Sequence, residues 1–536
     1  MRAAAPRRTG RRAMAELTID GRKVEVAAGT NLIEAARKLA IDIPYYCYHP
    51  ALAPVGSCRM CQVEILDPGK PPRVAIACRT EATQGLNVST TGKDCVAARA
   101  ATLEFLLANH PLDCPICDKA GECDLQDFTY RHGHGAGRFS EPKREKLKHE
   151  LIGDHILLDQ ERCILCTRCV RFMDEYAKSP SLVVAGRGDR NVIAIFPGEP
   201  IHSNYEGNLA DICPVGALTL KEFRFKSRVW DLSSEESVCT GCDRGCSVLL
   251  ETKRNRLLRV RPRVNLQVNG HFMCDQGRFG LLDAANPVAR EELGWVKGAR
   301  VTAAEAATAL ATTLAAERGR WLVLLSARLT GEELLLATAV LGPLAKQLAW
   351  VPTAASGGDD ILFTGRRAPN EKALERLSVP ALDEAAAAKV LAEPATAGLL
   401  CFDAALAARL LAQAKGKRLA LVDVVRDFDP AAGKAPHGAE LFVPGTLASE
   451  KDGTFLNVDA VLQRARRAQR WPQGTVAEAA LLLQVAATAS LSVAALTQKP
   501  DLTFALLEAL GQPGMLLNQL PDDGVKLTPT AAAVSA

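Results

Sequence analysis

Cysteine is the residue through which this sequence most plainly offers chemistry. All but one of its 17 cysteines lie between Cys47 and Cys274. A disulfide framework is not expected, because the chain opens without the apolar core of a secretory signal. Metal binding is the alternative, and the cysteines, joined by one histidine, fall into four groups of four. They are group 1 (Cys47, Cys58, Cys61, Cys78), group 2 (His110, Cys114, Cys117, Cys123), group 3 (Cys163, Cys166, Cys169, Cys213) and group 4 (Cys239, Cys242, Cys246, Cys274).

The spacing in groups 1 and 3 is typical of iron–sulfur sites. A cluster needs thiolates from several directions, so a short loop supplies two or three and a distant segment supplies the last. Group 3 has three cysteines in one loop and a remote Cys213 followed by proline, which is the bacterial ferredoxin arrangement. Group 1 has a longer first gap but keeps the pattern of a 2Fe-2S site. Zinc is the alternative at both, although zinc ribbons pair two knuckles and rarely place three cysteines in one loop.

Groups 2 and 4 are less regular. His110 stands four residues before Cys114, and no better fourth ligand lies nearby. A neutral imidazole in place of a thiolate would make a cluster less negative. Group 4 is compatible with zinc as an all-cysteine structural site, but iron is favoured. The two remaining thiols, Cys95 and Cys401, are expected to act as small hydrophobes.

Three arginines flank group 3, namely Arg162, Arg168 and Arg171. Their charge would favour the reduced, more negative form of a cluster bound there. The alternative is that they are solvated charges on a helix face. The sequence leaves both interpretations open.

The elements that must position these groups are visible in the periodicity. Alternating residues around Asp20-Gly21 predict a hairpin over residues 17–26, followed by a helix from an N-cap at Thr30 to about Leu39. A hairpin, a helix and then a cysteine loop predict a β-grasp ferredoxin. Farther along, apolar runs predict buried strands at residues 321–326, 398–402 and 418–423, and a capping box at residues 330–333 predicts a helix start.

Strands that alternate with Ala/Leu-rich helices indicate a parallel, Rossmann-like layer in the rear of the chain. No glycine-rich dinucleotide fingerprint follows those strands, so no dinucleotide site is predicted there. Residues 381–388 and 528–536 are interpreted as a linker and a tail.

The overall charge limits the partners. The 65 Lys and Arg residues against 61 Asp and Glu residues leave a net charge of +4, too balanced for a dedicated nucleic-acid-binding protein. The longest uncharged stretch, residues 479–498, suits a buried helix better than a membrane span, so no transmembrane segment is expected. The first thirteen residues contain five arginines and no acid, which indicates either an over-extended start before Met14 or a transit-type extension.

The front of the chain resembles the G subunit of NADH-quinone oxidoreductase, the large iron–sulfur subunit of respiratory complex I. The resemblance covers about residues 15–280. It is carried by Tyr-Tyr-Cys-Tyr-His-Pro at 45–50, Gly-Ser-Cys-Arg-Met-Cys at 56–61, Asn-His-Pro-Leu-Asp-Cys-Pro-Ile-Cys at 109–117, Gly-Glu-Cys-Asp-Leu-Gln-Asp at 121–127 and Gly-Asn-Leu-Ala-Asp-Ile-Cys-Pro-Val-Gly-Ala-Leu at 207–218. It implies that group 1 binds a 2Fe-2S cluster and that groups 2 and 3 each bind a 4Fe-4S cluster.

Group 4 and its surroundings resemble the N-terminus of molybdopterin oxidoreductases, which implies a further 4Fe-4S cluster outside the main relay. The rear portion is shorter than is usual in the family, so no molybdopterin is expected. NAD-linked formate dehydrogenases and hydrogenases share the front. Their ferredoxin domain carries eight cysteines for two clusters, whereas residues 170–212 here contain none. The formate dehydrogenase alternative would also need Cys401 as a molybdenum ligand.

The resemblance implies a fold class of α+β in the front, with a β-grasp 2Fe-2S ferredoxin and then His/Cys and ferredoxin-like 4Fe-4S modules, followed by an α/β molybdopterin-oxidoreductase-like domain. The expected segments are an extension (1–14), the 2Fe-2S domain (15–94), the His/Cys 4Fe-4S domain (95–150), the ferredoxin-like domain (151–230), the molybdopterin-oxidoreductase N-terminal-type domain (231–290), the truncated α/β domain (291–520) and a tail (521–536).

The implied function is electron transfer from a flavin- and NADH-binding partner through the clusters to further iron–sulfur subunits, toward quinone, beside the membrane arm of complex I. The alternative is a large or electron-input subunit of a soluble NAD-linked formate dehydrogenase or hydrogenase. The expected location is the cytoplasmic face of the inner (plasma) membrane as a peripheral subunit, or the mitochondrial matrix side if the arginine-rich start is a transit peptide.

Overall fold

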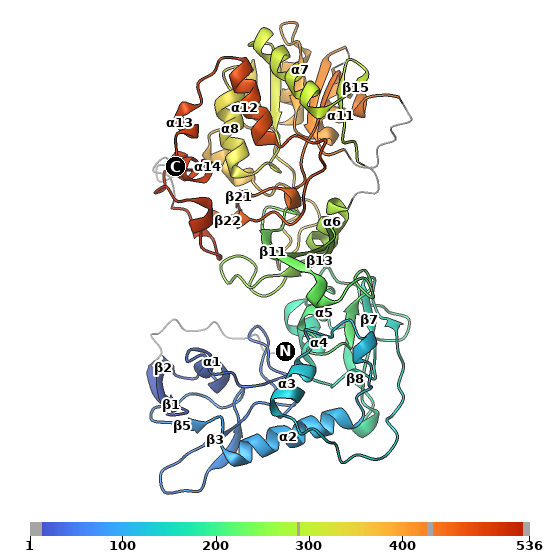
Figure 1. Ribbon diagram of the computed structural model, residues 1–536, viewed down its shortest axis with the longest axis vertical. Helices are drawn as coiled ribbons and strands as arrows, with labels where there is room; N and C mark the ends of the chain where they lie inside the picture. The colour runs from blue at the N-terminus through green and yellow to red at the C-terminus, as the bar shows by residue number, and fades with distance from the viewer. Residues whose placement is uncertain (1–12, 287–289, 415, 426–432, 529–536) are drawn as a thin grey trace. The chain divides into compact units, whose positions relative to one another are not determined.

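The computed structural model describes residues 13–286, 290–414, 416–425 and 433–528. The chain divides after Asp231 into two compact units, called unit 1 and unit 2 in chain order (Figure 1). Within the described ranges, no helix is both long and apolar enough to cross a membrane.

Unit 1 begins with a five-stranded sheet in the order β2-β1-β5-β3-β4. The predicted hairpin is confirmed, because β1 pairs antiparallel with β2 across a turn in which Asp20 and Gly21 have φ angles of 46° and 77°. Such positive φ angles are what a tight two-residue hairpin turn requires. One helix, α1, contributes buried apolar residues to the core beneath this sheet. The bounds are β1 Met14–Ile19, β2 Arg22–Ala27, α1 Leu32–Arg37, β3 Gln62–Ile65, β4 Arg73–Ile76 and β5 Asn87–Ser89.

The start of α1 differs from the prediction by one residue. The N-cap is Asn31, whose side chain accepts the amide of Glu34 at 3.1 Å. The hydroxyl of Thr30, one residue earlier, instead donates backward to the carbonyl oxygen of Ala27 at 2.6 Å. Both residues are typical helix caps, so the sequence alone could not choose between them.

The rest of unit 1 is built of short elements that surround long loops. Helix α2 starts where the amides of Asp94 and Cys95 donate to the carboxylate of Glu64 on β3. A small antiparallel sheet in the order β10-β7-β6 and a hairpin, β8 and β9, follow. The bounds are α2 Lys93–Ala108, α3 Asp124–His132, β6 Glu150–Leu151, β7 Ile156–Leu158, α4 Arg168–Arg171, β8 Val183–Ala185, β9 Val192–Ala194, α5 Asn208–Ile212 and β10 Leu218–Leu220.

Unit 2 opens with an antiparallel sheet, β11-β12-β13, against which α6 packs. A second three-stranded sheet, β21-β22-β23, lies beside β11. The bounds are β11 Ser233–Val238, β12 Ser247–Lys253, β13 Arg256–Pro262, α6 Asp275–Ala285, β21 Gly453–Leu456, β22 Val461–Ala465 and β23 Val525–Lys526.

The main body of unit 2 is a seven-stranded sheet in the order β15-β14-β20-β19-β18-β16-β17. The predicted buried strands are confirmed as β16, β18 and β19, and they pair in parallel. The predicted capping box is confirmed at Thr330 and Glu333, where α8 begins. The bounds are β14 Gly294–Val296, β15 Ala299–Val301, α7 Ala303–Ala316, β16 Trp321–Leu325, α8 Gly331–Leu341, β17 Gln347–Trp350, α9 Glu371–Arg376, α10 Glu384–Ala392, β18 Gly398–Cys401, α11 Ala404–Gln413, β19 Arg418–Asp423, β20 Leu441–Pro444, α12 Glu478–Thr488, α13 Ala494–Thr497 and α14 Leu502–Ala509.

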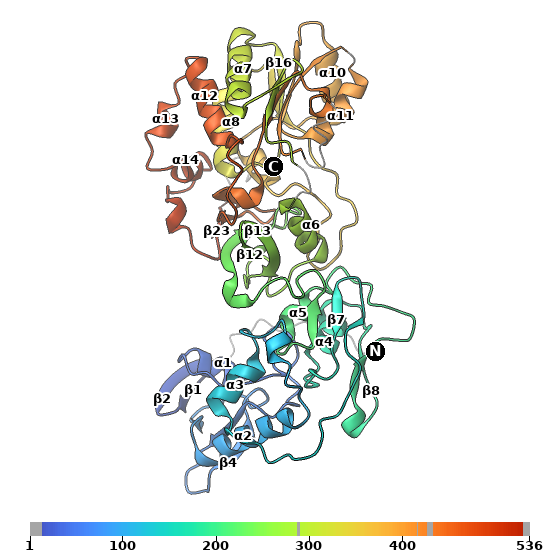
Figure 2. The ribbon, with the colours of Figure 1, turned by 45° about the vertical axis from the view of Figure 1, so that its right-hand side comes forward.

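Helices cover both faces of this sheet, as Figure 2 shows. Trp321, Val323 and Leu325 of β16 point to one face, under α7, α8, α12 and α14. The alternate residues Leu322 and Leu324 point to the other face, under α10 and α11. Burial on both faces is why these strands appear in the sequence as continuous apolar runs.

Two predictions in this unit are corrected or refined. The segment 381–388, interpreted as a linker, contains the start of α10, where Asp383 accepts the amide of Ala386 at 2.6 Å as an N-cap. Its alanines are therefore helical. The stretch 479–498 holds most of the buried helix α12 and then the short helix α13. All of the predicted tail 528–536 except Thr528 lies outside the described residues.

Candidate metal centres

Group 1 is assembled from the loop before β3 and the segment after β4. Cys47, Cys61 and Cys78 are buried and Cys58 is half-buried. The thiols hydrogen-bond in pairs, Cys47 with Cys58 and with Cys78, and Cys61 with Cys78. Hydrogen bonding to Cys47 and Cys61 raises the pKa of Cys78, while the bond to Cys78 lowers that of Cys61. Four converging thiols behind a five-stranded sheet are the chemistry that a small iron–sulfur core requires.

Group 2 lies between α2 and α3. His110 follows the end of α2, Cys114 begins a short 3-10 turn, and Cys123 is the N-cap residue of α3. Burial, and then the charges of Lys143 and Arg162, lower the pKa of His110 to about 4. The imidazole is therefore neutral at pH 7, which is the form that binds metal.

The thiols of group 2 are unequally covered. Cys114 is exposed, whereas Cys117 and Cys123 are buried. Burial raises the pKa of Cys123 to about 11. Group 2 thus reaches the surface of unit 1 on the side of Cys114.

Group 3 is held in a tight loop whose backbone is strained. Leu165 and Thr167, the residues between its three nearby cysteines, have φ angles of 52° and 60°. Positive φ is unfavourable for such side chains and is found where a site over-determines the backbone. The loop curls around an enclosed pocket lined by the four thiols and by apolar residues such as Leu158, Ile193 and Val215.

Burial determines the protonation state of the group 3 thiols. It raises the pKa of Cys163 to about 12 and that of Cys166 to about 11. The amide of Leu165 donates to the sulfur of Cys163 at 3.4 Å. Thiols that resist ionisation in this way would release their protons to solvent only when a strongly positive core binds the sulfur atoms.

Groups 2 and 3 contact each other through the turn at Cys213 and Pro214. A Cβ atom on Gly216 would lie 2.1 Å from the sulfur of Cys117, so only glycine fits beside this thiol. The amide of Asp124, next to Cys123, donates to the carbonyl oxygen of Pro214 at 3.0 Å. The backbone that follows the last cysteine of group 3 therefore contacts group 2 directly. Sequence reasoning missed this contact, although the glycine of the Cys-Pro-Val-Gly stretch was a visible signal.

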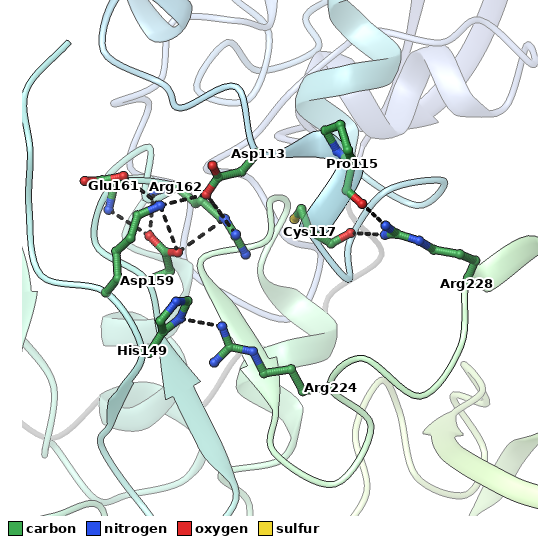
Figure 3. A network of polar contacts seen from close by, with 10 residues as sticks. Asp113, Pro115, Cys117, His149, Asp159, Glu161, Arg162, Arg224 and Arg228 are labelled. Atoms are coloured by element: carbon green, nitrogen blue, oxygen red, sulfur yellow. Dashed lines mark hydrogen bonds and ion pairs between the residues drawn. The ribbon is translucent and has the colours of Figure 1, made fainter.

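A network of polar contacts that includes the buried residues Arg162 and Asp159 joins the same two groups (Figure 3). Arg162, next to Cys163, contacts Asp113, next to Cys114, at 2.8 Å, and also Asp159 at 3.3 Å. Lys148 contacts Asp113 at 2.7 Å. Arg228 donates to the carbonyl oxygens of Cys117, at 2.7 Å, and of Pro115. These contacts join the loops that carry the predicted ligands of groups 2 and 3.

The three arginines that flank group 3 are buried, so their interpretation as solvated charges is wrong. The exposed fractions of Arg162, Arg168 and Arg171 are 3%, 7% and 8%. Arg168 donates to the carbonyl oxygen of Ile212 at 3.1 Å, beside Cys213. A buried guanidinium next to cysteine ligands favours added negative charge there.

Group 4 is formed by the loop between β11 and β12 and by the start of α6. All four thiols are buried, and Cys274 is the N-cap residue of α6. Two backbone amides point at sulfur, that of Gly241 at Cys239 (3.4 Å) and that of Gly277 at Cys274 (3.3 Å). A Cβ atom on Gly277 would lie 2.9 Å from the sulfur of Cys239, which explains a glycine here.

Among the described residues, no set of three or more His, Cys, Asp or Glu side chains converges as around a single metal ion. The two remaining thiols are ordinary core residues. Cys95 donates to the carbonyl oxygen of Gly92 at 3.2 Å, and Cys401 to that of Asp403 at 3.2 Å. Both are fully buried.

A cavity of about 250 Å³ lies in unit 2 at the carboxyl ends of the parallel strands. Ser326, Phe402 and Asp423 line it from the sheet, and Gly241 and Gln276 line it from the group 4 side. Such edges are where α/β sheets commonly bind ligands. The volume is below the roughly 300–1,000 Å³ usual for drug-sized ligands, and a pterin dinucleotide is larger still. Cys401 is not among the lining residues, so this cavity does not fit a thiolate-bound molybdenum cofactor.

Four family models match the front of the chain. They are a 2Fe-2S iron–sulfur cluster binding domain (residues 12–93), the NADH-ubiquinone oxidoreductase-G iron–sulfur binding region (99–138), the ferredoxin-like domain of NADH-quinone oxidoreductase subunit 3 (153–219) and the molybdopterin oxidoreductase Fe4S4 domain (232–285). Their order agrees with that of groups 1 to 4, and the predicted fold class is confirmed.

The curated relatives agree with these family models. The G subunit of NADH-quinone oxidoreductase from Streptomyces coelicolor is 41% identical over 325 residues, which are 59% of this chain and 38% of that protein. Over these residues the chain is similar to that subunit. The protein of the same name from Mycobacterium bovis is 42% identical over 61% of this chain and 41% of its own length. The mitochondrial 78 kDa subunit of NADH-ubiquinone oxidoreductase from Neurospora crassa is 42% identical over 50% and 36%.

The resemblance to the large iron–sulfur subunit of complex I is thus confirmed, and the matches span about two fifths of the length of these relatives. A solved chain of NAD+-reducing [NiFe]-hydrogenase is 31% identical, with a TM-score of 0.36, over 40% of this chain and 92% of its own. The assignment of individual residues as ligands stays a prediction, now with known burial and contacts for each.

Proposed function

We propose that this chain is an electron-transfer iron–sulfur subunit of NADH-quinone oxidoreductase. In this role it accepts electrons that originate from NADH by way of a flavin-bearing partner and passes them to further iron–sulfur subunits, toward quinone. The observation that carries the proposal is the direct contact between the groups in unit 1. Gly216 touches Cys117, Arg162 pairs with Asp113, and Arg171 donates to the carbonyl oxygen of Cys47.

The cysteine groups would hold the cofactors as follows: a 2Fe-2S cluster at group 1 and a 4Fe-4S cluster at each of groups 2, 3 and 4. When bound, such clusters take up and release single electrons. The chain itself supplies burial that excludes water, amides that donate to sulfur, and buried arginines beside group 3. The amides and the arginines stabilise negative charge at the site, which raises its reduction potential.

Group 3 is the proposed middle of the relay, because hydrogen bonds and an ion pair link it to both of the others. It reaches group 1 through Arg171 and group 2 through Arg162 and Gly216. Group 4 belongs to unit 2, so it is proposed to stand outside this relay and to be structural.

We propose the other complex I subunits as partners: the flavin- and NADH-binding subunit, the downstream iron–sulfur subunits and the membrane arm. The chain would be peripheral to the membrane, on the cytoplasmic face in a bacterium or on the matrix side in a mitochondrion. No molybdopterin is expected, consistent with the size of the unit 2 cavity and the position of Cys401.

The experiment is to purify the chain with its neighbouring subunits without oxygen, add NADH and record EPR spectra. We expect signals of one 2Fe-2S and of 4Fe-4S centres to be reduced by NADH, and about 14 iron atoms per chain. About 10 iron atoms with one zinc would place zinc at group 4. Molybdenum or tungsten with formate-dependent dye reduction, or hydrogen-dependent dye reduction, would instead support the formate dehydrogenase or hydrogenase alternative. A colourless, EPR-silent protein that binds only zinc would refute electron transfer.

A further inference from the structure

Arg171 extends from group 3 to group 1. It is the last residue of α4 and lies two positions after Cys169. Its Nη1 atom donates to the carbonyl oxygen of Ala53 at 2.7 Å, and its Nη2 atom donates to that of Cys47. A side chain from the group 3 helix is therefore bound to the backbone of a group 1 cysteine.

The charge of Arg171 has no carboxylate partner within ion-pair distance among the described residues. Arg162, by comparison, contacts both Asp113 and Asp159, and Arg168 lies 3.9 Å from Asp124. Glu175, one turn beyond Arg171, accepts the amide of Ala53 instead. Carbonyl oxygens satisfy two of the guanidinium donors but do not neutralise its charge.

Arg171 is also buried, with an exposed fraction of 8%. Its Nε atom has no hydrogen-bond partner in the described part of the chain. A buried, unpaired cation is costly unless negative charge lies close by. The cysteines on its two sides belong to group 1 and group 3, namely Cys47, whose carbonyl oxygen it binds, and Cys169, two residues earlier in the chain. Four thiolates around iron and sulfide carry net negative charge, which increases on reduction.

We propose that Arg171 is a shared tuning residue that raises the reduction potentials of the centres at groups 1 and 3 together. This inference rests on the proposed function, in which both groups hold iron–sulfur clusters. Each centre takes up one electron, no proton is transferred, and the guanidinium stays protonated throughout. One positive charge between two neighbouring centres raises both potentials in the same direction, so the difference that drives electron transfer between them changes little.

The test compares Arg171→Gln with Arg171→Lys in the assembled complex. Both centres are titrated with redox mediators and followed by EPR, and iron is counted. In Arg171→Gln we expect the ratio of reduced to oxidised form at a fixed potential to fall about tenfold at each centre, which is a shift of about 59 mV. Arg171→Lys keeps the charge, so its potentials should stay near those of the parent protein.

Arg73→Gln is the matched control. Arg73 is in the same unit, its side chain is 59% exposed, and it pairs with Asp67 at 3.3 Å. The substitution removes the same charge from a solvent-exposed position, where water and salt screen it. The reduction potential of neither centre should therefore change.

Several outcomes decide the proposal. If iron is retained and the Gln variant shifts only one centre or none, the shared role is refuted. If the Lys variant shifts both centres as far as Gln does, or if both variants lose iron, Arg171 is a structural clamp and the proposal is wrong. If Gln alone loses iron while Lys keeps both potentials, the requirement is for charge, as proposed. A parent protein without cluster signals would refute the proposed function itself, which separates the two failures.

Discussion

Buried charge is balanced in two different ways in unit 1 and in the main body of unit 2. Beside group 3, Arg171 is buried without a carboxylate partner among the described residues. In unit 2, Lys451 is equally buried but lies 3.0 Å from Glu333 and 3.2 Å from Glu478. The main body of unit 2 therefore neutralises its own charges, whereas unit 1 leaves positive charge and a set of thiols for something else to neutralise.

This difference indicates which part of the chain depends on its cofactors. Glu333 is also the capping-box residue of α8, and Glu478 begins α12, so the triad ties two helices of unit 2 together. The contact between α4 and the loop around Cys47 is of another kind, because it runs through the unpaired charge of Arg171. We infer that the loops of unit 1 that carry groups 1 to 3 are ordered largely by metal and that the main body of unit 2 is a scaffold ordered by packing.

The largest expected effect follows from removing iron from the whole chain with a chelator and an oxidant. Without the clusters, the buried thiols must take up protons and Arg171 loses its neutralising charge, so unit 1 should open. Hydrogen exchange should then lose protection along residues 47–61 and in α4, while β16, β18 and β19 keep theirs. Equal protection in both units after iron removal would contradict the comparison.

The next largest effect is expected from Lys451→Met. It leaves Glu333 and Glu478 buried without a cation, and breaking a buried ion pair costs about 3–5 kcal/mol. The free energy of unfolding of unit 2 should fall by that amount in denaturant titrations followed by tryptophan fluorescence, with the EPR signals of unit 1 unchanged.

Lys346→Met is the control for this measurement. Lys346 pairs with Glu393 at 2.5 Å, but the side chain of Glu393 is 48% exposed. Its loss should cost less than about 1 kcal/mol. If the free energy of unfolding falls by a similar amount in the two variants, the buried ion pairs of Lys451 stabilise unit 2 no more than an exposed pair does.

A smaller effect concerns Asp423, at the end of β19. Burial raises its pKa from 3.8 to about 6, although it accepts the amides of Ala404 and Val424. Because the folded pKa is above the unfolded one, its contribution to stability is fully present below about pH 4 and is lost as the pH rises through about 6. The expected loss is at most about 3 kcal/mol.

In Asp423→Asn the side chain no longer titrates, so the melting temperature of unit 2 should depend less on pH between 4 and 7. Asp383→Asn is a matched control, since Asp383 caps α10 from an exposed position and asparagine is an equally good helix cap. A pH profile that stays unchanged in Asp423→Asn would mean that this carboxyl group ionises normally.

How much could be predicted from the sequence depends on how local the signal is. Cysteine spacing predicts the four groups, because most of each set lies in one loop, and their assignment as ligands stays a prediction. Continuous apolar runs located β16, β18 and β19, because both of their faces are buried. The capping box of α8 is also a local pattern, so the sequence predicts it. Arg171 and Cys47 are 124 residues apart in the sequence, and no local pattern encodes a contact between residues so far apart.

The remaining misses have similar causes. Thr30 and Asn31 are both good caps, so the sequence could not fix which of the two begins the helix. The alanines of 384–388 favour helix by intrinsic propensity, but their low complexity made them resemble a linker. The burial of Arg162, Arg168 and Arg171 depends on loops that come from elsewhere in unit 1.

The smallest effect we predict concerns His110, the one neutral ligand among the sixteen predicted. His110→Cys replaces a neutral imidazole, whose pKa of about 4 keeps it uncharged at pH 7, with a thiolate. The centre at group 2 should keep its iron but become more negative, so its reduction potential should fall by roughly 100 mV. An EPR-monitored redox titration measures this shift.

The control is His134→Cys, because His134 is exposed in the glycine-rich segment after α3. It introduces the same thiol away from the predicted ligands, so the potential of group 2 should not change. If His110→Cys leaves the potential unchanged as well, His110 is not a ligand, and group 2 must take its fourth ligand from elsewhere. A fall confined to His110→Cys would instead show that unit 1 sets the potential of each centre by the charge that its own ligands bring to the iron.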